Sequence, residues 1–71
     1  MFNNEKELIQ SLFKIGQTLE LEYMDDPYAP PTGTKGKIVH IDDMGQIHVE
    51  WENGSSLALI YGKDKFRIVK E

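Results

Sequence analysis

The sequence contains no cysteine, which excludes a disulfide framework and a thiolate metal site. It has no apolar run of the ~20 residues that a membrane-spanning helix needs. Its N-terminus lacks the basic region and apolar core of a secretory signal. Lysine and arginine form no cluster along the chain, and the formal net charge is −4. These absences favour a cytoplasmic protein without a membrane partner, and they argue against direct nucleic-acid binding, which needs a positively charged surface.

Sequence patterns of catalysis are also missing. The chain has no phosphate-binding loop, no dinucleotide fingerprint, and no Ser/His/Asp or Cys/His order. Its 71 residues suffice for one small domain whose core leaves little room for an enclosed active site. We therefore predict a single domain over residues 1–71 that is not an enzyme and that holds no metal or other cofactor.

The stretch from residue 33 to residue 59 alternates apolar and polar side chains, the pattern of half-buried strands. Two turn signals divide it into strands at 33–41, 47–51 and 55–59. The turn at 43–45 reads as a three-residue loop that ends in glycine. This loop places Ile41 opposite Ile47 and Val39 opposite Val49, so that the apolar faces coincide.

The second turn allows two registers. A two-residue turn at Asn53-Gly54 would put Leu57 and Leu59 on the polar face, because a slip of one residue inverts a strand. A three-residue loop at 52–54 instead sets Leu57 opposite Val49 and Leu59 opposite Ile47. We therefore predict the three-residue loop, which keeps Trp51 in the same apolar layer.

Two further strands are expected, at 18–23 and 66–69. A proline-containing loop at 25–33 follows the first of them, and a turn at 60–64 precedes the second. Five short strands with a long first loop, two tight hairpins and a short return predict a mainly β fold. We expect a small five-stranded SH3-like barrel over residues 17–70, with an added N-terminal α-helix. Its expected core consists of Leu19, Leu21, Tyr23, Val39, Ile41, Ile47, Val49, Trp51, Leu57, Leu59, Phe66 and Ile68.

The helix is expected over residues 4–15. Asn4 is the predicted N-cap, Gly16 is the predicted C-terminal glycine, and a helical stripe of apolar residues lies between them. The stripe consists of Leu8, Ile9, Leu12 and Phe13. So short a helix needs a docking surface. It either covers an open end of the barrel or binds a partner, which leaves the protein a monomer or a weak homodimer formed through this helix.

Two groups of polar residues are candidates for a metal site or for acid–base chemistry. His40 and His48 fall opposite each other in the predicted register, but a metal ion needs further ligands, so we expect polar surface rather than a metal site. Asp25-Asp26 and Asp42-Asp43 are acidic doublets that could act in acid–base chemistry. Each lies at a turn, where aspartate bonds nearby backbone N–H groups, and we favour that structural role.

The proline-containing loop is the best candidate for a binding site. Tyr28, Pro30 and Pro31 would form a stiff, partly apolar rim, and aromatic residues commonly anchor interfaces. Asp25 and Asp26 begin the loop, and Tyr61 is a further possible member of the same surface. The alternative is that Tyr28 folds back over Trp51 and closes the core.

Several segments between residues 16 and 69 resemble a family of uncharacterised bacterial and phage proteins, domain of unknown function four-three-one-four. The resemblance is carried by residues 24–28, 31–36, 42–45, 47–59 and 64–66. It implies an accessory protein of prophages or conjugative elements, with no assigned activity and no catalytic residues to transfer.

Three functions remain open at this stage. The first is a protein-binding module of a mobile element that occludes or recruits a host or element protein. The second is an anti-defence inhibitor of a nucleic-acid machine, which would present acidic residues to a basic channel. Those residues would be Asp25, Asp26, Asp42, Asp43, Glu50 and Glu52. The third is a barrel that stacks nucleic-acid bases on its aromatic side chains, which the acidic balance disfavours.

Overall fold

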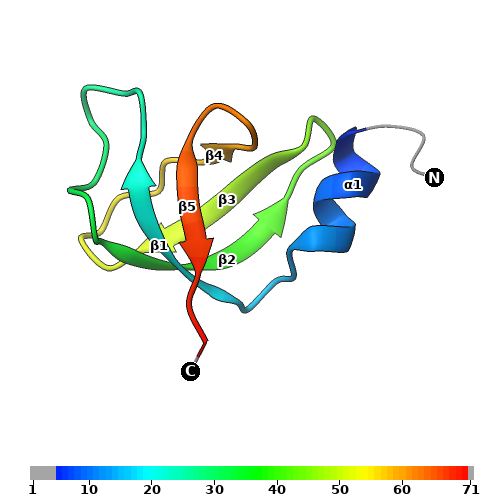
Figure 1. The fold of residues 1–71 in the computed structure, drawn as a ribbon, viewed down its shortest axis with the longest axis horizontal. Helices are drawn as coiled ribbons and strands as arrows, with labels where there is room; N and C mark the ends of the chain where they lie inside the picture. The colour runs from blue at the N-terminus through cyan, green and yellow to red at the C-terminus, as the bar shows by residue number, and fades with distance from the viewer. Residues whose placement is uncertain (1–4, 71) are drawn as a thin grey trace.

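The computed structural model describes residues 5–70 and shows a bent β-sheet with one short helix at its end (Figure 1). The elements are α1 (Glu5–Leu12), β1 (Thr18–Tyr23), β2 (Lys35–Ile41), β3 (Gln46–Trp51), β4 (Leu59–Ile60) and β5 (Lys65–Ile68). All five strands form one antiparallel sheet in the order β4-β3-β2-β1-β5. The mainly β fold with an N-terminal helix is confirmed. The described part of the chain contains no helix long and apolar enough to cross a membrane.

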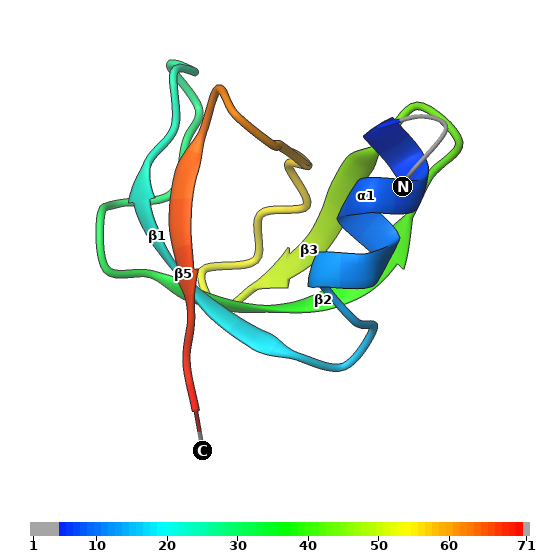
Figure 2. The same ribbon diagram turned by 45° about the vertical axis from the view of Figure 1, so that its right-hand side comes forward.

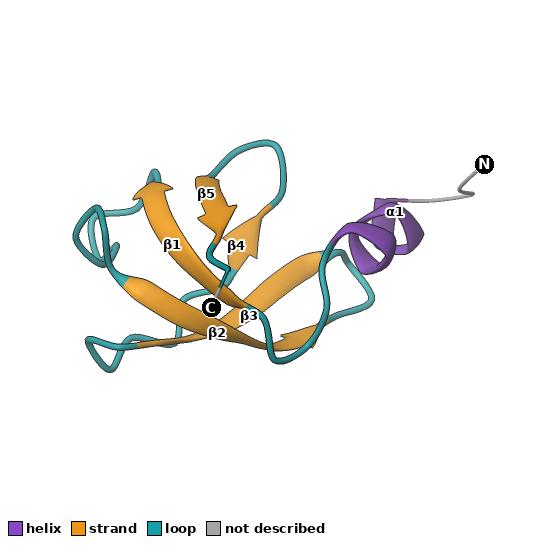
Figure 3. Ribbon diagram, turned by 60° about the horizontal axis from the view of Figure 1, so that its bottom comes forward, coloured by secondary structure: helices purple, strands orange, loops and turns teal. Residues whose placement is uncertain are grey.

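The sheet is open, because β4 and β5 are its two edges and do not pair as strands (Figure 3). The expectation of a closed barrel is therefore wrong for the described residues. One reason is that β4 is short: the indole Nε1–H of Trp51 donates to the carbonyl of Leu57 at 2.9 Å, and the Ser55 hydroxyl accepts from the Leu57 N–H at 3.3 Å. These bonds hold residues 55–58 outside the ladder, so the expected strand at 55–59 is wrong for most of its length.

Both predicted three-residue hairpin loops are confirmed. Gly45 donates its N–H to the carbonyl of Asp42 at 3.0 Å, and Gly54 does the same to Trp51 at 3.0 Å. Both glycines have positive φ, 83° and 89°, as the last residue of such loops requires. The resulting registers pair Ile41 with Ile47 and Ile47 with Leu59.

A β-bulge in β2 changes which residues enter the core. Ile38 pairs with Val49, and His40 pairs with His48, so Val39 is the extra residue between them. The bulge turns Ile38 inward, where it is fully buried, and turns Val39 outward, where it is 41% exposed. The assignment of Val39 to the core is therefore wrong, although the predicted opposition of His40 and His48 is confirmed.

A second irregularity lies at the end of β1. Leu21 pairs with Phe66 and Tyr23 pairs with Lys65, so the register shifts between them. Tyr23 is 54% exposed, and the next residue, Met24, is buried instead. The assignment of Tyr23 to the core is wrong for the same reason as that of Val39, because a bulge inverts the alternation that follows it.

The remaining core predictions agree with the observed burial. The buried members are Leu19, Leu21, Ile41, Ile47, Val49, Trp51 and Leu59, and Leu57, Phe66 and Ile68 pack against them half-buried. Gly36 lies beneath Trp51, where a Cβ atom would come within 2.9 Å of the indole Cε3. Only glycine fits there, which explains a residue of low strand propensity inside β2.

The helix is shorter than expected and covers one end of the sheet (Figures 1 and 2). It ends at Leu12, and Gly16 serves a later turn, where its N–H donates to the carbonyl of Ile38 at 2.7 Å. The backbone after the helix bonds to β2 instead of continuing the helix, so the expected end at residue 15 is wrong. Asn4, the expected N-cap, lies outside the described residues. Ile9 is buried in the contact between the helix and the sheet, and Leu12 is 46% exposed.

Candidate functional site

The loop from residue 24 to residue 34, called the proline loop below, is fixed by its own backbone and side chains. Asp26 accepts the N–H of Tyr28 at its Oδ1 atom (2.7 Å) and the N–H of Ala29 at its carbonyl (3.0 Å). The carbonyl of Pro31 accepts the hydroxyl of Thr34 at 2.6 Å. Asp26 therefore has the structural turn role expected of the doublet, and Asp25 is exposed beside it.

Tyr28 projects from this loop into solvent with 83% of its surface exposed. It cannot be a lid on Trp51, so that alternative is wrong. The loop closes the core through Ala29, which packs against the buried cluster, and through Pro30, which is buried. Pro31 is exposed. Of the predicted rim residues, Tyr28 and Pro31 are thus accessible and Pro30 is structural.

A separate groove lies between the end of α1 and the turn that joins β4 to β5. It has a volume of about 420 Å³, and three of its eight lining residues are aromatic. The lining residues, called the aromatic groove below, are Phe13, Glu22, Tyr61, Gly62, Asp64, Lys65, Phe66 and Ile68. No residue of the proline loop lines it. Tyr28 and Tyr61, which were predicted to share one surface, therefore lie on two, with Tyr28 on the proline loop and Tyr61 in the groove.

The aromatic rings of the groove contact one another. The ring of Phe13 meets Tyr61 edge-on, with centroids 5.7 Å apart, and meets Phe66 at a tilted angle at 5.3 Å. Such geometries are the favourable ones for aromatic pairs. Phe13 and Phe66 are half-buried, so each is partly accessible from the groove that it lines.

A buried carboxylate holds the turn that carries Tyr61. Asp64 is 8% exposed, and its Oδ2 atom accepts the backbone N–H of Ile60 at 2.8 Å. The backbone N–H of Asp64 donates to the carbonyl of Ile60 at 2.9 Å. This double contact fixes the β4–β5 turn and hence the position of Tyr61. Phe13 and Asp64 were not predicted as parts of a site, because the groove joins segments far apart in the chain.

The proline loop and the β4–β5 turn lie at the same end of the sheet. Tyr23, at the end of β1, pairs with Lys65, at the start of β5. The proline loop and the β4–β5 turn therefore leave the sheet at the same end, as Figures 1 and 2 show. Glu22 and Lys65, both exposed, contribute opposite charges to the groove there.

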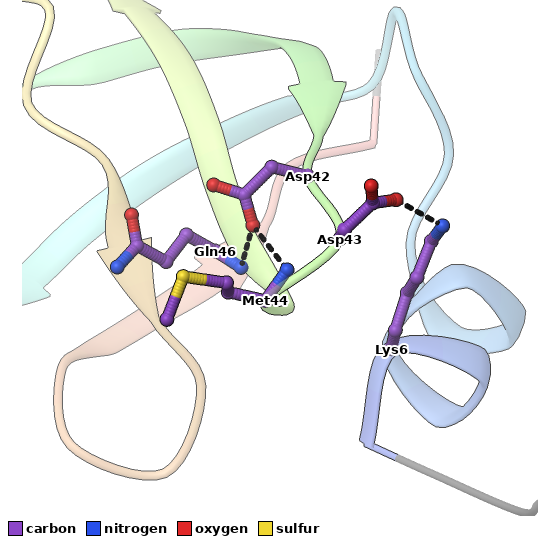
Figure 4. Close-up of polar contacts among 5 residues, drawn as sticks. All are labelled: Lys6, Asp42, Asp43, Met44 and Gln46. Atoms are coloured by element: carbon purple, nitrogen blue, oxygen red, sulfur yellow. Dashed lines mark hydrogen bonds and ion pairs between the residues drawn. The ribbon is translucent and has the colours of Figure 1, made fainter.

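Asp42 organises the turn between β2 and β3 (Figure 4). Its Oδ1 atom accepts the N–H groups of Met44 and Gln46, both at 2.9 Å, and its Oδ2 atom lies 2.8 Å from Nε2 of His48. The hydrogen bond from His48, helped by the N–H groups of Gln46 and Met44, lowers the pKa of Asp42 below its ordinary value. The doublet thus holds a turn, as the sequence analysis favoured.

Asp43 connects the same turn to the helix. Its Oδ1 atom accepts a hydrogen bond from the Lys6 ammonium at 2.6 Å (Figure 4). The Lys6 contact lowers the pKa of Asp43. The neighbouring rings of His40 and His48 lie 5.6 Å apart, but among the described residues no group of three or more possible ligands could hold a metal ion.

Charges of opposite sign face each other across the outer side of the sheet. Glu20 pairs in register with Lys35 and with Arg67, whose Nη2 atom lies 3.2 Å from its carboxylate. Lys37 pairs in register with Glu50. Cross-strand pairs of this kind stabilise a sheet modestly and leave no strong field of one sign.

The fold and its groove define a small mainly β protein with an accessible aromatic surface. The family model of a domain of unknown function, DUF4314, matches residues 3–69, and the chain belongs to this family. The resemblance noted in the sequence is thereby confirmed. Searches of curated proteins and of solved structures gave no match.

Proposed function

We propose that this protein is a small non-catalytic binding module whose ligand is another protein, received in the aromatic groove. The observation that carries the proposal is the groove itself, where Phe13, Tyr61 and Phe66 border a space of about 420 Å³. Aromatic residues are enriched at interfaces and supply many of their strongest contacts. Spaces of ~300–1,000 Å³ are typical of ligand sites, so this one has room for a few side chains of a partner.

We further propose that the sheet is an SH3-like arrangement left open between β4 and β5. Five short antiparallel strands, a long loop after the first strand and two tight hairpins support this assignment. In SH3-like modules the long first loop flanks the ligand groove. Here the proline loop leaves the sheet beside the groove, so Tyr28 is available as a second contact for the same partner.

The family resemblance supports a role on a phage or mobile element. In that setting the module would act by occluding or recruiting a host or element protein. A non-catalytic role agrees with the structural use of the Asp–His pair in the chain, because Asp42 and His48 together hold a hairpin turn.

The two other candidate functions have weaker support from the contacts. An inhibitor that offers acidic residues to a basic channel would need them free, but Asp42 and Asp43 are engaged with His48 and Lys6. A nucleic-acid-binding surface would need an excess of positive charge. The outer side of the sheet pairs its cations with Glu20 and Glu50 instead.

The proposal is tested by selecting ligands from a random peptide library displayed on phage, with no bias towards any conformation. Selected peptides are then titrated into the ¹⁵N-labelled protein. The proposal expects the largest shifts at the amides of Tyr61, Gly62 and Phe66. Failure to select any peptide, or shifts confined to the outer side of the sheet around Lys37, would refute the groove as the binding site.

A further inference from the structure

Strand β5 is an edge strand of the sheet (Figure 2). It pairs with β1 on one side, and the N–H of Val69 donates to the carbonyl of Thr18 at 2.9 Å. In an antiparallel pair, alternate residues direct their backbone groups to opposite sides. The N–H and C=O groups of Phe66 and Ile68 therefore point away from β1, towards the open edge.

The same two residues line the groove with their side chains. Among the described residues, no other strand pairs with this edge, so it offers outward-facing backbone groups together with an apolar space. These are the two requirements for binding by strand addition, in which main-chain hydrogen bonds give affinity and pockets for alternate side chains give specificity.

The edge is basic, although the chain as a whole is acidic. Residues 63–70 contain four of the eight cationic residues and one of the twelve acidic ones, a net charge of +3 in a chain of net charge −4. The cationic residues are Lys63, Lys65, Arg67 and Lys70, and all are exposed, whereas the one acidic residue, Asp64, is buried. The charge of this segment therefore favours an acidic partner.

The neighbouring strand shows which sequence pattern β5 accepts. Along β5, basic and apolar residues alternate as Lys65-Phe66-Arg67-Ile68. The paired strand β1 alternates leucine and glutamate. Glu20 pairs with Arg67, Leu21 with Phe66, and Leu19 with Ile68. A strand added on the opposite side of β5 meets the same alternation of basic and apolar side chains.

We infer that the ligand of the groove is an extended segment of a partner protein that alternates acidic and apolar residues and pairs with the free edge of β5. Its apolar side chains enter the aromatic groove, and its carboxylates lie near Lys65, since Arg67 already bonds Glu20 of β1. This inference rests on the proposed binding function and names the class of its ligand. A second copy of β5 is disfavoured at this edge, because its lysine and arginine would face like charges.

The test uses the full chain and a short capped peptide that alternates glutamate and leucine. A control peptide alternates lysine and leucine. Binding is followed by ¹⁵N NMR titration, and amide exchange of Phe66 and Ile68 is measured with and without peptide. We expect saturable shifts and slowed exchange at these two amides with the glutamate peptide, because strand addition gives their N–H groups acceptors.

Two variants test the charge complementarity. Lys65→Gln removes a cation at the edge, and Lys37→Gln makes the same exposed change on β2, away from the edge. We expect Lys65→Gln to weaken binding of the glutamate peptide by about three- to fivefold, the range of an exposed ion pair. Lys37→Gln should leave its affinity unchanged.

Three results would overturn the inference: no binding of the glutamate peptide, equal binding of the lysine peptide, or shifts without protection of the Phe66 and Ile68 amides. If such a result accompanies library peptides that still bind at Tyr61, the partner class is wrong and the binding function stands. If the library also gives no ligand for the groove, both proposals fail.

Discussion

The side chain of Ile9 lies directly over Gly45, so closely that a Cβ atom at residue 45 would stand 3.1 Å from Ile9 Cδ1. Gly45 also has a φ of 83°, which the three-residue hairpin requires. One residue thus serves two purposes, because it forms the turn between β2 and β3 and gives α1 a flat surface on which to dock. The position of the helix, and with it that of Phe13 in the groove, depends on this contact.

Replacing Gly45 by alanine should destabilise the protein more than the same change at Gly54. Both glycines have positive φ, but a Cβ atom at Gly54 meets nothing within 4 Å. Strain at φ costs ~1–3 kcal/mol in each variant, and only Gly45→Ala also pushes against Ile9. Chemical denaturation of the two variants measures the difference. Equal losses would contradict the docking role of Gly45.

Ile9→Ala should lower the free energy of unfolding by ~2–5 kcal/mol, because Ile9 is 1% exposed and leaves a cavity at the helix contact. Lys6→Ala is the matched control on the same helix. Its ion pair with Asp43 is largely exposed, so it should cost less than about 1 kcal/mol. If Ile9→Ala kept its stability but converted a dimer to a monomer, the helix would serve assembly rather than the fold.

The protein should lose stability as the pH falls below about 4, the ordinary range of aspartate. The pKa values of Asp42 and Asp43 are lowered in the folded state, so the unfolded chain binds protons more readily. Their contribution is present above that range and is lost as the pH falls through the lowered values. Asp42→Asn should reduce stability at pH 7 and flatten this acid dependence. An unchanged pH profile would contradict the role assigned to Asp42.

Trp51 should contribute to stability in two separable ways. Trp51→Ala removes a side chain that is 4% exposed and should cost ~3–5 kcal/mol. Trp51→Phe keeps much of the ring but leaves the carbonyl of Leu57 without its indole donor, which should cost ~1–3 kcal/mol. Thermal or chemical unfolding of both variants checks this order. A phenylalanine variant as stable as the wild type would show that the hydrogen bond contributes nothing.

The hairpins could be predicted from the sequence because their signals are local. Gly45 and Gly54 each end a three-residue loop, and the apolar residues on both sides agree with only one register. The pairing of His40 with His48 followed from that register. The acidic doublets were likewise assigned to turns from their position alone.

The bulges could not be predicted, because they leave no local mark in the sequence. Val39 and Tyr23 continue a regular alternation in the chain, and only the pairing with neighbouring strands turns them outward. The shortness of β4 was also not predictable, because the indole N–H of Trp51 donates a hydrogen bond to the carbonyl of Leu57. The sequence gives no sign that an indole will replace a ladder hydrogen bond.

The groove was missed for a related reason. Phe13 was predicted as part of the apolar stripe of the helix, and Phe66 as part of the core. Both pack half-buried against the core cluster. Their meeting with Tyr61 depends on where the helix docks and on the turn held by Asp64. The expectation that lysine and arginine form no cluster is wrong for residues 63–70, which hold four of the eight cationic residues. Their position matters because β5 is an edge strand.

Tyr61 is the residue whose replacement bears most on the binding of a partner protein in the aromatic groove. Tyr61 is 37% exposed and borders the groove, whereas Tyr28 is 83% exposed on the proline loop. Both can be changed to alanine, and the melting temperature of each variant shows whether the fold survives. Tyr28→Ala should leave it unchanged, because so exposed a ring adds little to packing.

The deciding measurement is the Kd of a library-selected peptide for the wild type, Tyr61→Ala and Tyr28→Ala under identical conditions. We expect Tyr61→Ala to weaken binding about 30-fold or more, equivalent to the ~2 kcal/mol of an interface hot spot. Tyr28→Ala should weaken it less. An unchanged Kd for folded Tyr61→Ala, with a large loss of affinity for Tyr28→Ala, would contradict binding in the groove and place the binding site on the proline loop.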